Sequence, residues 1–359
     1  MVNIINETFN DEFTAEEKKL LTRVTEKYDF EIYNFTKVRS AYKLETDKGT
    51  ICLKKNNHGS HKASNGNLLV KELIANNFTN VAKYISTKEG HLLVTANKSF
   101  FYATEWINGE ECDLSSITEV ENCSKLLAQF HLATRKIDAS KFIIRNNLKN
   151  WPKSFKKNLD DLQKFKRIIQ KKKVKSKFDN IYLNNIEGYY NRGMSILKLL
   201  KESEYQKLST IANENKTICH DSFYYQNIIK MQDKYYMIDL DSIMIDLQVN
   251  DLGKFIRRLM YKSEYKWDFT KASLIMKAYE SINKLTRSEH VVMLALILFP
   301  HKFWKLGKKK YTRNKSWDES KYLHKVKKLL KYNEAEERFL NEYLEYINNN
   351  FNENKVVKF

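Results

Sequence analysis

The sequence predicts an α+β protein of two lobes, a small N-terminal antiparallel sheet with one helix followed by a larger, mainly helical lobe. Three observations support this prediction. Short alternating runs separated by polar turns fill residues 30–106, apolar residues recur at helical spacing over most of 107–359, and a single hairpin pattern at 217–241 interrupts the helical part. We therefore predict two domains, residues 1–106 and 107–359, with the boundary at Trp106.

The N-terminal lobe begins with a capping box at residues 14–17, which predicts a short leading helix. A helix at 67–78 carries Glu72 and turns Leu69 and Leu73 inward. The alternating segments that read as strands are 30–33, 41–46, 50–55, 81–85, 91–95 and 100–106. Polar residues at 47–49, ending in Gly49, predict a turn between the second and third of these strands. The lobe is thus expected to be an antiparallel meander with one helix inserted.

The C-terminal lobe follows a turn at residues 107–110 and is expected to be helical on both sides of the hairpin. A second capping box at 118–121 and a cap at Ser316 with Glu319 mark two helix starts. The other predicted helices are 151–169, 178–200, 252–260, one from 269, 286–299 before Pro300, and 333–347. A small sheet followed by a large helical lobe with an inserted hairpin is the layout of the protein-kinase-like fold.

Composition bounds the class of protein. A chain of 359 residues with 42% hydrophobic residues is long enough to bury a large core. No run of about 18 uncharged apolar residues occurs, so we expect no membrane span, and we expect no signal peptide because the N-terminus is acidic and polar. The four cysteines are scattered without metal-binding spacing, which is typical of reduced thiols.

The net charge of +19 raises the question of an acidic partner. Lysine and arginine dominate affinity for nucleic-acid phosphates, so a basic nucleic-acid binder is one hypothesis. Solvated lysines in a chain biased towards Lys, Asn, Ile and Tyr explain the charge without any partner, and we rank nucleic acid as unlikely. Basic runs at residues 164–177 and 302–331 leave an acidic partner surface open.

The stretch at 217–241 carries the densest chemistry. A polar loop at 220–227 is followed by two short apolar runs, 228–231 and 235–238, which a polar turn separates. This pattern predicts a hairpin that brings Asp239 to the same end as Asn227. A carboxylate and an amide oxygen are ligands that hold Mg²⁺ on nucleotide phosphates, so ATP and Mg²⁺ are the predicted cofactors.

The N-terminal lobe offers candidate nucleotide contacts. Lys54 ends an apolar strand, where its ammonium group can reach phosphates, and Glu72 is the candidate ion-pair partner for it. The backbone at Glu105 and Ile107 is the candidate contact for an adenine base. Between residues 31 and 48 there is no glycine, so the segment 36–40 would have to cover the phosphates without one.

Taken together, the motifs resemble the CotS-type spore coat proteins, a branch of the aminoglycoside phosphotransferase and choline kinase-like superfamily. They are residues 53–54, 105–110, 129–133, 219–227, 238–239 and 246–252, and the resemblance extends over about residues 25 to 345. It implies a kinase-like fold, other spore coat proteins as partners, and a location in the mother-cell cytoplasm and the spore coat. It also implies that Asp251 supports the loop backbone.

One position departs from the family pattern. The family has His-x-Asp, four residues and Asn, with the Asp as catalytic base, whereas Ser222 stands five residues before Asn227 and Asp221 lies one place earlier. A serine hydroxyl has a very high pKa, so without an activating partner it stays protonated near neutral pH and cannot act as that base. We therefore favour a pseudokinase that binds ATP with weak or absent phosphotransfer. The alternative is an active phosphotransferase acting on a small-molecule or protein hydroxyl, with Asp221 as its base.

Overall fold

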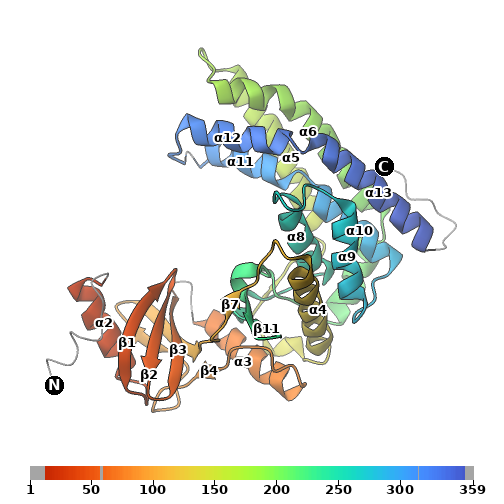
Figure 1. Cartoon of the computed structure of the whole chain (residues 1–359). Helices are drawn as coiled ribbons and strands as arrows, with labels where there is room; N and C mark the ends of the chain where they lie inside the picture. The colour runs from red at the N-terminus through yellow and green to blue at the C-terminus, as the bar shows by residue number, and fades with distance from the viewer. Residues whose placement is uncertain (1–12, 57–59, 314, 352–359) are drawn as a thin grey trace. The chain divides into compact units, whose positions relative to one another are not determined.

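The computed structural model describes residues 13–56, 60–313 and 315–351, and the chain divides into two compact units. The first unit is formed by residues 1–145 together with 220–244, and the second by 146–219 together with 245–359. The predicted succession of a small antiparallel sheet and a mainly helical remainder is confirmed (Figure 1). The predicted boundary at residue 106 lies inside the first unit, which also contains most of the stretch at 217–241.

An antiparallel sheet forms the N-terminal part of the first unit. Its strands run in the order β1 (Ile32–Val38), β2 (Ala41–Thr46), β3 (Gly49–Asn56), β6 (Ser99–Glu105) and β4 (Tyr84–Ile85), with β5 (Val94–Ala96) also paired to β6. The helix α2 (Ala15–Thr25) starts at the predicted capping box, where the Thr14 side chain accepts from the backbone N–H of Glu17. Leu21 and Val24 of α2 join Phe35 and Leu44 of the sheet in one buried cluster. This burial fixes α2 on one face of the sheet.

Each of the two turns of the meander has a residue with a positive φ, and the residue type differs between them. Val38 pairs with Ala41, which leaves Arg39 and Ser40 as a two-residue loop, and Arg39 takes a left-handed φ of 56°. Gly49 follows the second turn at a φ of +96°, a conformation that a residue without Cβ adopts freely. The turn between β1 and β2 therefore closes without the glycine that this conformation favours.

The rest of the first unit consists of α3 (His61–Ala75), α4 (Ile117–Thr134) and a second small sheet. In that sheet β10 (Ile228–Met231) lies between β11 (Lys234–Met237) and β7 (Glu110–Glu111). Ile228 pairs with Met237 and Met231 with Lys234, so the predicted hairpin is confirmed, with Gln232 in its turn at a φ of 56°. The short helix η3 (Leu240–Ser242) follows the hairpin and packs against α3.

The second unit is almost entirely helical. Its helices are α5 (Trp151–Gln170), α6 (Lys177–Glu202), α7 (Tyr205–Glu214), α8 (Val249–Met260), α9 (Phe269–Glu280), α10 (Arg287–Leu298), α11 (His301–Tyr311), α12 (Glu319–Leu330) and α13 (Asn333–Asn350). Helices α11 and α12 pack along α5 and α6 (Figure 1). Gly307 permits this close approach, because a Cβ there would lie 2.2 Å from the Tyr182 hydroxyl.

A third sheet contains β8 (Arg145–Asn146), β12 (Met244–Ile245) and β9 (Ile218–Cys219), in that order, where the chain passes from one unit to the other in sequence. Within the second unit, the Thr217 hydroxyl donates to the Asp246 carbonyl oxygen at 2.6 Å. The Asp246 carboxylate accepts from Asn147 Nδ2 at 2.7 Å and from Trp151 Nε1 at 3.1 Å. These bonds anchor the strand that leads into the polar loop.

Some predicted boundaries are wrong. Helix α3 begins six residues before the predicted start at 67 and ends at Ala75 rather than 78. The predicted caps at Thr118 and Ser316 are each displaced by two residues, because Ser116 accepts from Glu119 N and Asp318 from Lys321 N. In both cases a second capping residue nearby has the extended backbone that a cap requires.

All four cysteines are buried, and none of these described residues forms a disulfide. None of the helices in the described ranges has the length and the apolar character needed to span a bilayer.

Candidate nucleotide site

The first unit contains a cavity of about 390 Å³, a size suited to a small-molecule ligand. It is enclosed by the β1–β2 turn, the strands β3 and β6, the segment after β6, and the end of the β10–β11 hairpin. Five of the predicted site residues line it, namely Lys54, Glu105, Ile107, Asn227 and Asp239. Three do not line it, and these are Glu72, Asp221 and Ser222.

Lys54 and Asp239 form the centre of the cavity wall. Lys54 Nζ lies 2.5 Å from Asp239 Oδ1, and both side chains are mostly buried. Burial is the largest influence on the pKa of Lys54 and lowers it, but the charge of Asp239, the hydrogen bond to it and the smaller effects of Cys52 and Asp241 together leave that pKa above its ordinary value. Burial likewise raises the pKa of Asp239, while Lys54 outweighs it and holds that pKa below its ordinary value. Each partner therefore keeps the other charged near neutral pH.

Asp241 places a second carboxylate close to the first. It accepts a hydrogen bond from the Tyr102 hydroxyl at 3.2 Å and another from the Ser242 hydroxyl at 3.1 Å. Burial and then the negative charge of Asp239 raise the pKa of Asp241. Asp239 and Asp241 thus place two carboxylates, the hard oxygen ligands that suit Mg²⁺, close together.

The predicted pair of Lys54 and Glu72 is wrong. The Glu72 carboxylate instead binds Lys141, with Oε1 lying 2.7 Å from Nζ. The α3 residue that lines the cavity is Val70. Glu72 follows two residues later, about 200° further around the helix, so it cannot face the same way. In this unit Lys54 has its carboxylate neighbours in the segment after β11, rather than on α3.

Gly66 and Tyr84 were not identified from the sequence. A Cβ at Gly66 would lie 2.1 Å from the Tyr84 hydroxyl, so only glycine lets that tyrosine reach this position. The Tyr84 ring stacks on Tyr102 at 5.4 Å, and both rings line the cavity. The available signal was a glycine inside a helix, but the predicted helix began at 67, one residue too late.

Asn227 lies in the short helix η2 (Tyr225–Asn227), just before β10. Its Nδ2 donates to the Ser222 carbonyl oxygen at 3.0 Å, and its own carbonyl oxygen accepts from Ile238 N at 3.0 Å. With the amide nitrogen engaged in the loop, the side-chain Oδ1 is the atom suited to a cation. The hairpin thus brings an amide oxygen and the Asp239 carboxylate to one cavity, as the sequence predicts.

His220 fixes the preceding loop. Its Nε2 lies 3.2 Å from the Ile238 carbonyl oxygen, an acceptor, so Nε2 carries the proton in the neutral ring. Its Nδ1 then accepts from the Ser222 hydroxyl at 3.2 Å. Ser222 is therefore held by His220 through its hydroxyl and by Asn227 through its backbone carbonyl oxygen.

Asp221 points its carboxylate elsewhere. Its Oδ2 lies 3.4 Å from Arg145 NH2, and its backbone has a left-handed φ of 64° that Asp tolerates better than most residues. An aspartate that serves as general base needs to reach the proton of the acceptor hydroxyl. Asp221 instead sits beside a guanidinium group and outside the cavity lining.

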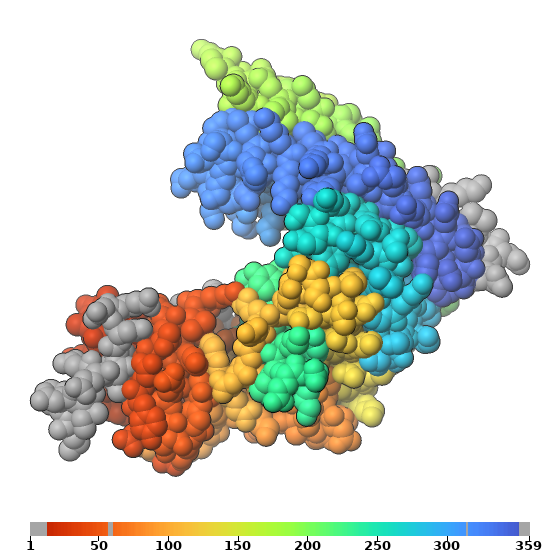
Figure 2. Space-filling view, in the orientation of Figure 1, coloured from red at the N-terminus to blue at the C-terminus, as the bar shows by residue number. Residues whose placement is uncertain are grey.

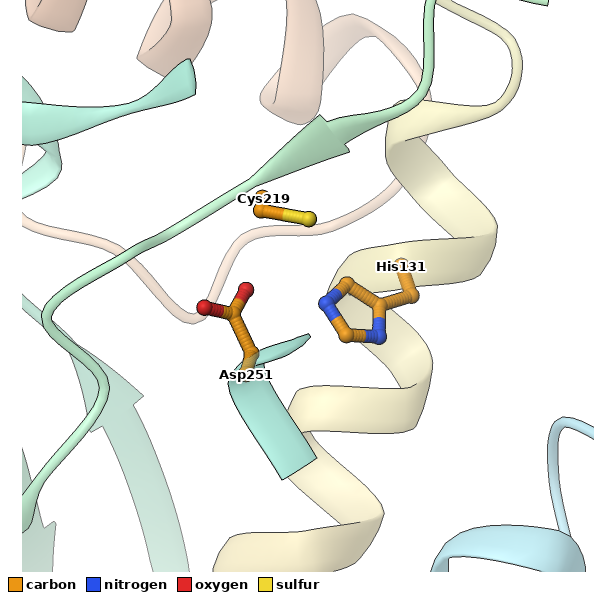
Figure 3. A group of neighbouring side chains, drawn as sticks. All are labelled: His131, Cys219 and Asp251. Carbon is orange, nitrogen blue, oxygen red and sulfur yellow. The ribbon is translucent and has the colours of Figure 1, made fainter. Parts of the chain in front are cut away.

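Within the second unit, the strand that precedes the polar loop lies beside α8. Cys219 ends β9 and Asp251 lies in the first turn of α8, and both side chains are buried. Figure 3 shows these two side chains as neighbours, and the Cys219 sulfur and an Asp251 carboxylate oxygen lie within 4.8 Å of each other. Asp251 thus lies next to the residue that precedes His220, where a loop-supporting role was predicted.

The fold and this site define the protein as kinase-like, with a lysine, an asparagine and an aspartate gathered at one cavity beside a small antiparallel sheet. The chain belongs to the family described as "Spore coat putative kinase YutH", which matches residues 22–343. It is 23% identical over 264 residues to spore coat protein S of Bacillus subtilis (strain 168), covering 72% of this chain and 74% of the relative.

Solved structures agree on the fold. An aminoglycoside phosphotransferase from Alicyclobacillus acidocaldarius is similar with a TM-score of 0.80 and 19% identity, covering 91% of this chain and 96% of that one. An amicoumacin kinase, solved in complex with AMP-PNP, Ca²⁺ and Ami, has a TM-score of 0.61 and 12% identity, with 94% and 96% covered. The predicted kinase-like fold and the predicted resemblance to spore coat proteins are both confirmed.

Proposed function

We propose that this chain is a spore coat protein whose first unit binds ATP with Mg²⁺ and whose phosphotransfer is weak or absent. The proposal rests on which candidate residues line the cavity and which do not. Lys54, Asn227 and Asp239 line one cavity, whereas Asp221 and Ser222 do not. The groups suited to hold a nucleotide are together, and the group suited to accept a proton is not among them.

The donor set fits the proposed ligands. Asp239 and Asn227 offer hard oxygen atoms at the cavity, and Asp241 adds a carboxylate behind them, which suits Mg²⁺. Lys54 offers a positive charge to phosphate oxygens. Trp106 and Ile107 line the cavity beyond β6, where backbone and ring can contact a base. Asn227 and Asp239 would hold the Mg²⁺, which would neutralise charge on the phosphates. The amicoumacin kinase of similar fold, solved with AMP-PNP and Ca²⁺, supports the same ligand class.

Binding is tested by thermal unfolding with Mg-ATP. At about one hundred times the dissociation constant, bound nucleotide stabilises the folded state by about 2.7 kcal/mol. Lys54→Met and Asp239→Asn should each abolish this stabilisation. Lys55→Met is the matched control, because Lys55 is the neighbouring lysine on β3 and does not line the cavity. An unchanged melting temperature at millimolar Mg-ATP in the wild type would refute nucleotide binding.

Catalysis is tested separately, by comparing ATP turnover in the wild type, Asp221→Ala and Ser222→Asp. We expect little turnover in the wild type and a gain in Ser222→Asp, since that change puts a carboxylate five residues before Asn227. Efficient wild-type turnover that Asp221→Ala removes would establish the active phosphotransferase instead.

Spore association rests on the family and is tested by localisation. A tagged copy made in the mother cell should accumulate in the spore coat during sporulation. A copy that stays dispersed in the mother cell, with the spore free of signal, would contradict a role in the coat.

A further inference from the structure

Half of the protein's net charge is concentrated in one short segment of the second unit. Residues 301–331 contain eleven lysines and one arginine against two acidic residues, a net charge of +10 out of the chain's +19. The segment consists of α11, the connection and α12, which lie at the surface of the unit (Figure 2, blue). Uniformly solvated lysines would be spread along the chain, so this concentration calls for a separate explanation.

Four of these lysines surround one tryptophan. The ammonium groups of Lys309, Lys321, Lys325 and Lys315 lie 4.5, 4.9, 5.3 and 5.4 Å from the centre of the Trp317 ring. We call these four residues the Trp317 lysine cluster. Three of them are exposed to solvent, and Lys309 is partly exposed. The ring thus holds several positive charges at one point of the surface.

The two acids of the segment are already engaged. Asp318 caps α12 by accepting from Lys321 N at 2.8 Å, and Glu319 accepts from Phe178 N at 2.8 Å while it binds Lys310. Among the described residues of 301–331, Lys310 is the cation with a carboxylate partner. Elsewhere lysines such as Lys172 and Lys230 are paired with Asp179 and Glu119.

The pKa of Lys309 also indicates that positive charges outnumber negative charges around it. The pKa of Lys309 lies below its ordinary value, first because of partial burial and then because of Lys305, Lys315 and Lys325. The charged neighbours that lower it are all cations. Bringing like charges together in this way costs free energy, and an anionic partner would recover that cost.

We propose that the Trp317 lysine cluster, with Lys305 beside it, is a docking surface for an acidic polypeptide segment of another protein. Two features favour a polypeptide over a nucleic acid. The four members of the cluster are lysines, which act as point charges, and Arg313 is the one arginine among the charged neighbours of Lys309, whereas planar bidentate recognition of phosphate favours arginine. The Trp317 ring already has four ammonium groups within 5.4 Å of its centre and Tyr322 at 5.3 Å, so a stacked base would have to displace these neighbours.

The surface is independent of the nucleotide site, because it lies on α11, α12 and the connection between them in the second unit and uses none of the cavity residues. A spore coat is a protein layer, so membership of this family makes an acidic protein segment a reasonable occupant. The proposal requires neither ATP binding nor catalysis.

The test uses the full chain and a fluorescently labelled poly-L-glutamate of about 20 residues, with anisotropy measured at about 50 and about 300 mM salt. The cluster variant carries Lys309→Glu, Lys321→Glu and Lys325→Glu. The matched control carries Lys153→Glu, Lys157→Glu and Lys164→Glu, exposed lysines of α5 that undergo the same change in net charge. We expect the cluster variant to bind about tenfold more weakly or worse, and the control to stay within about twofold of the wild type.

Three outcomes would overturn the proposal. They are no binding by the wild type at low salt, an equal loss in both triple variants, and tighter binding of a single-stranded oligothymidylate of the same length than of poly-L-glutamate. A neutral variant with Lys309→Gln, Lys321→Gln and Lys325→Gln guards against misfolding, since it should also lose affinity while it melts at the wild-type temperature.

Discussion

Replacing Asp246 with asparagine should change how the stability of this protein depends on pH. Asp246 is fully buried in the second unit, where its carboxylate accepts from Asn147, from Trp151 and from the backbone N–H of Leu247. These three bonds favour the charged carboxylate, yet burial outweighs them and raises the pKa of Asp246 to about 6. The folded state therefore holds this proton more tightly than the unfolded chain does.

The sign and size of the pH dependence follow from the difference between the pKa of Asp246 in the folded state and in the unfolded chain. A carboxyl group whose pKa rises from 3.8 to about 6 on folding stabilises the folded state below pH 4, and this contribution is lost as the pH rises to about 6. The difference corresponds to about 3 kcal/mol, or roughly 6–12 °C in melting temperature for a unit of this size. The amide of the Asp246→Asn variant has no such proton to lose, so the variant lacks this dependence.

The measurement is thermal unfolding of the wild type and Asp246→Asn between pH 4 and pH 7.5. Other carboxyl groups titrate in both proteins, so the informative quantity is the difference in melting temperature between them at each pH. We expect that difference to shift in favour of the variant by roughly 6–12 °C from pH 4 to pH 7.5. The exposed Asp160→Asn is the control and should show no such shift. Parallel profiles for the wild type and Asp246→Asn would refute the reasoning.

Two further changes test the packing of each unit. Gly66→Ala should destabilise the protein by about 1–3 kcal/mol, because the new methyl group would displace the Tyr84 hydroxyl from its place beside α3, and it should weaken the response to Mg-ATP. Its control is Gly188→Ala, because a Cβ at Gly188 would have no neighbour within 4 Å and the change should gain about 1 kcal/mol from helix propensity. Equal unfolding temperatures in the two variants would contradict the close approach of Gly66 and Tyr84. Arg192→Met should cost about 3–5 kcal/mol near pH 8, because it removes the guanidinium that pairs with the buried Glu336. The cost should be smaller near pH 5, since burial raises the pKa of Glu336 and a protonated acid needs no counter-charge. Chemical denaturation at the two pH values measures the cost, with Arg192→Lys as the milder change. A loss of stability that does not depend on pH would contradict this account.

The candidate site was predictable where its residues sit on regular elements joined by short turns. The hairpin at 228–237 has its turn and its paired strands within a few residues, so local pattern alone brings Asn227 and Asp239 together. Lys54 likewise lines the cavity, because the alternation of β3 determines which of its side chains face that way. In each case the relevant interactions lie close together in the sequence.

The ion-pair partner of Glu72 was misassigned because it depends on how α3 is rotated about its axis, and not only on whether the helix is there. Helix α3 was expected, with its start six residues too late, but its sequence does not say which face meets the sheet. Val70 takes the cavity side and Glu72 binds Lys141, which is 69 residues away in the sequence. The same limitation applied to Gly66, whose use is apparent only beside Tyr84.

The sequence by itself determined the kinase-like fold class, the family and the position of Ser222 five residues before Asn227, because periodicity, turn residues and motif spacing are properties of the linear chain. Only the tertiary structure decided which charges meet. It paired Lys54 with Asp239, turned Asp221 to Arg145, and gathered four lysines around Trp317. The physical reason is that electrostatic and packing energies depend on distances between side chains, and those distances are set by helix rotation and loop closure rather than by local pattern.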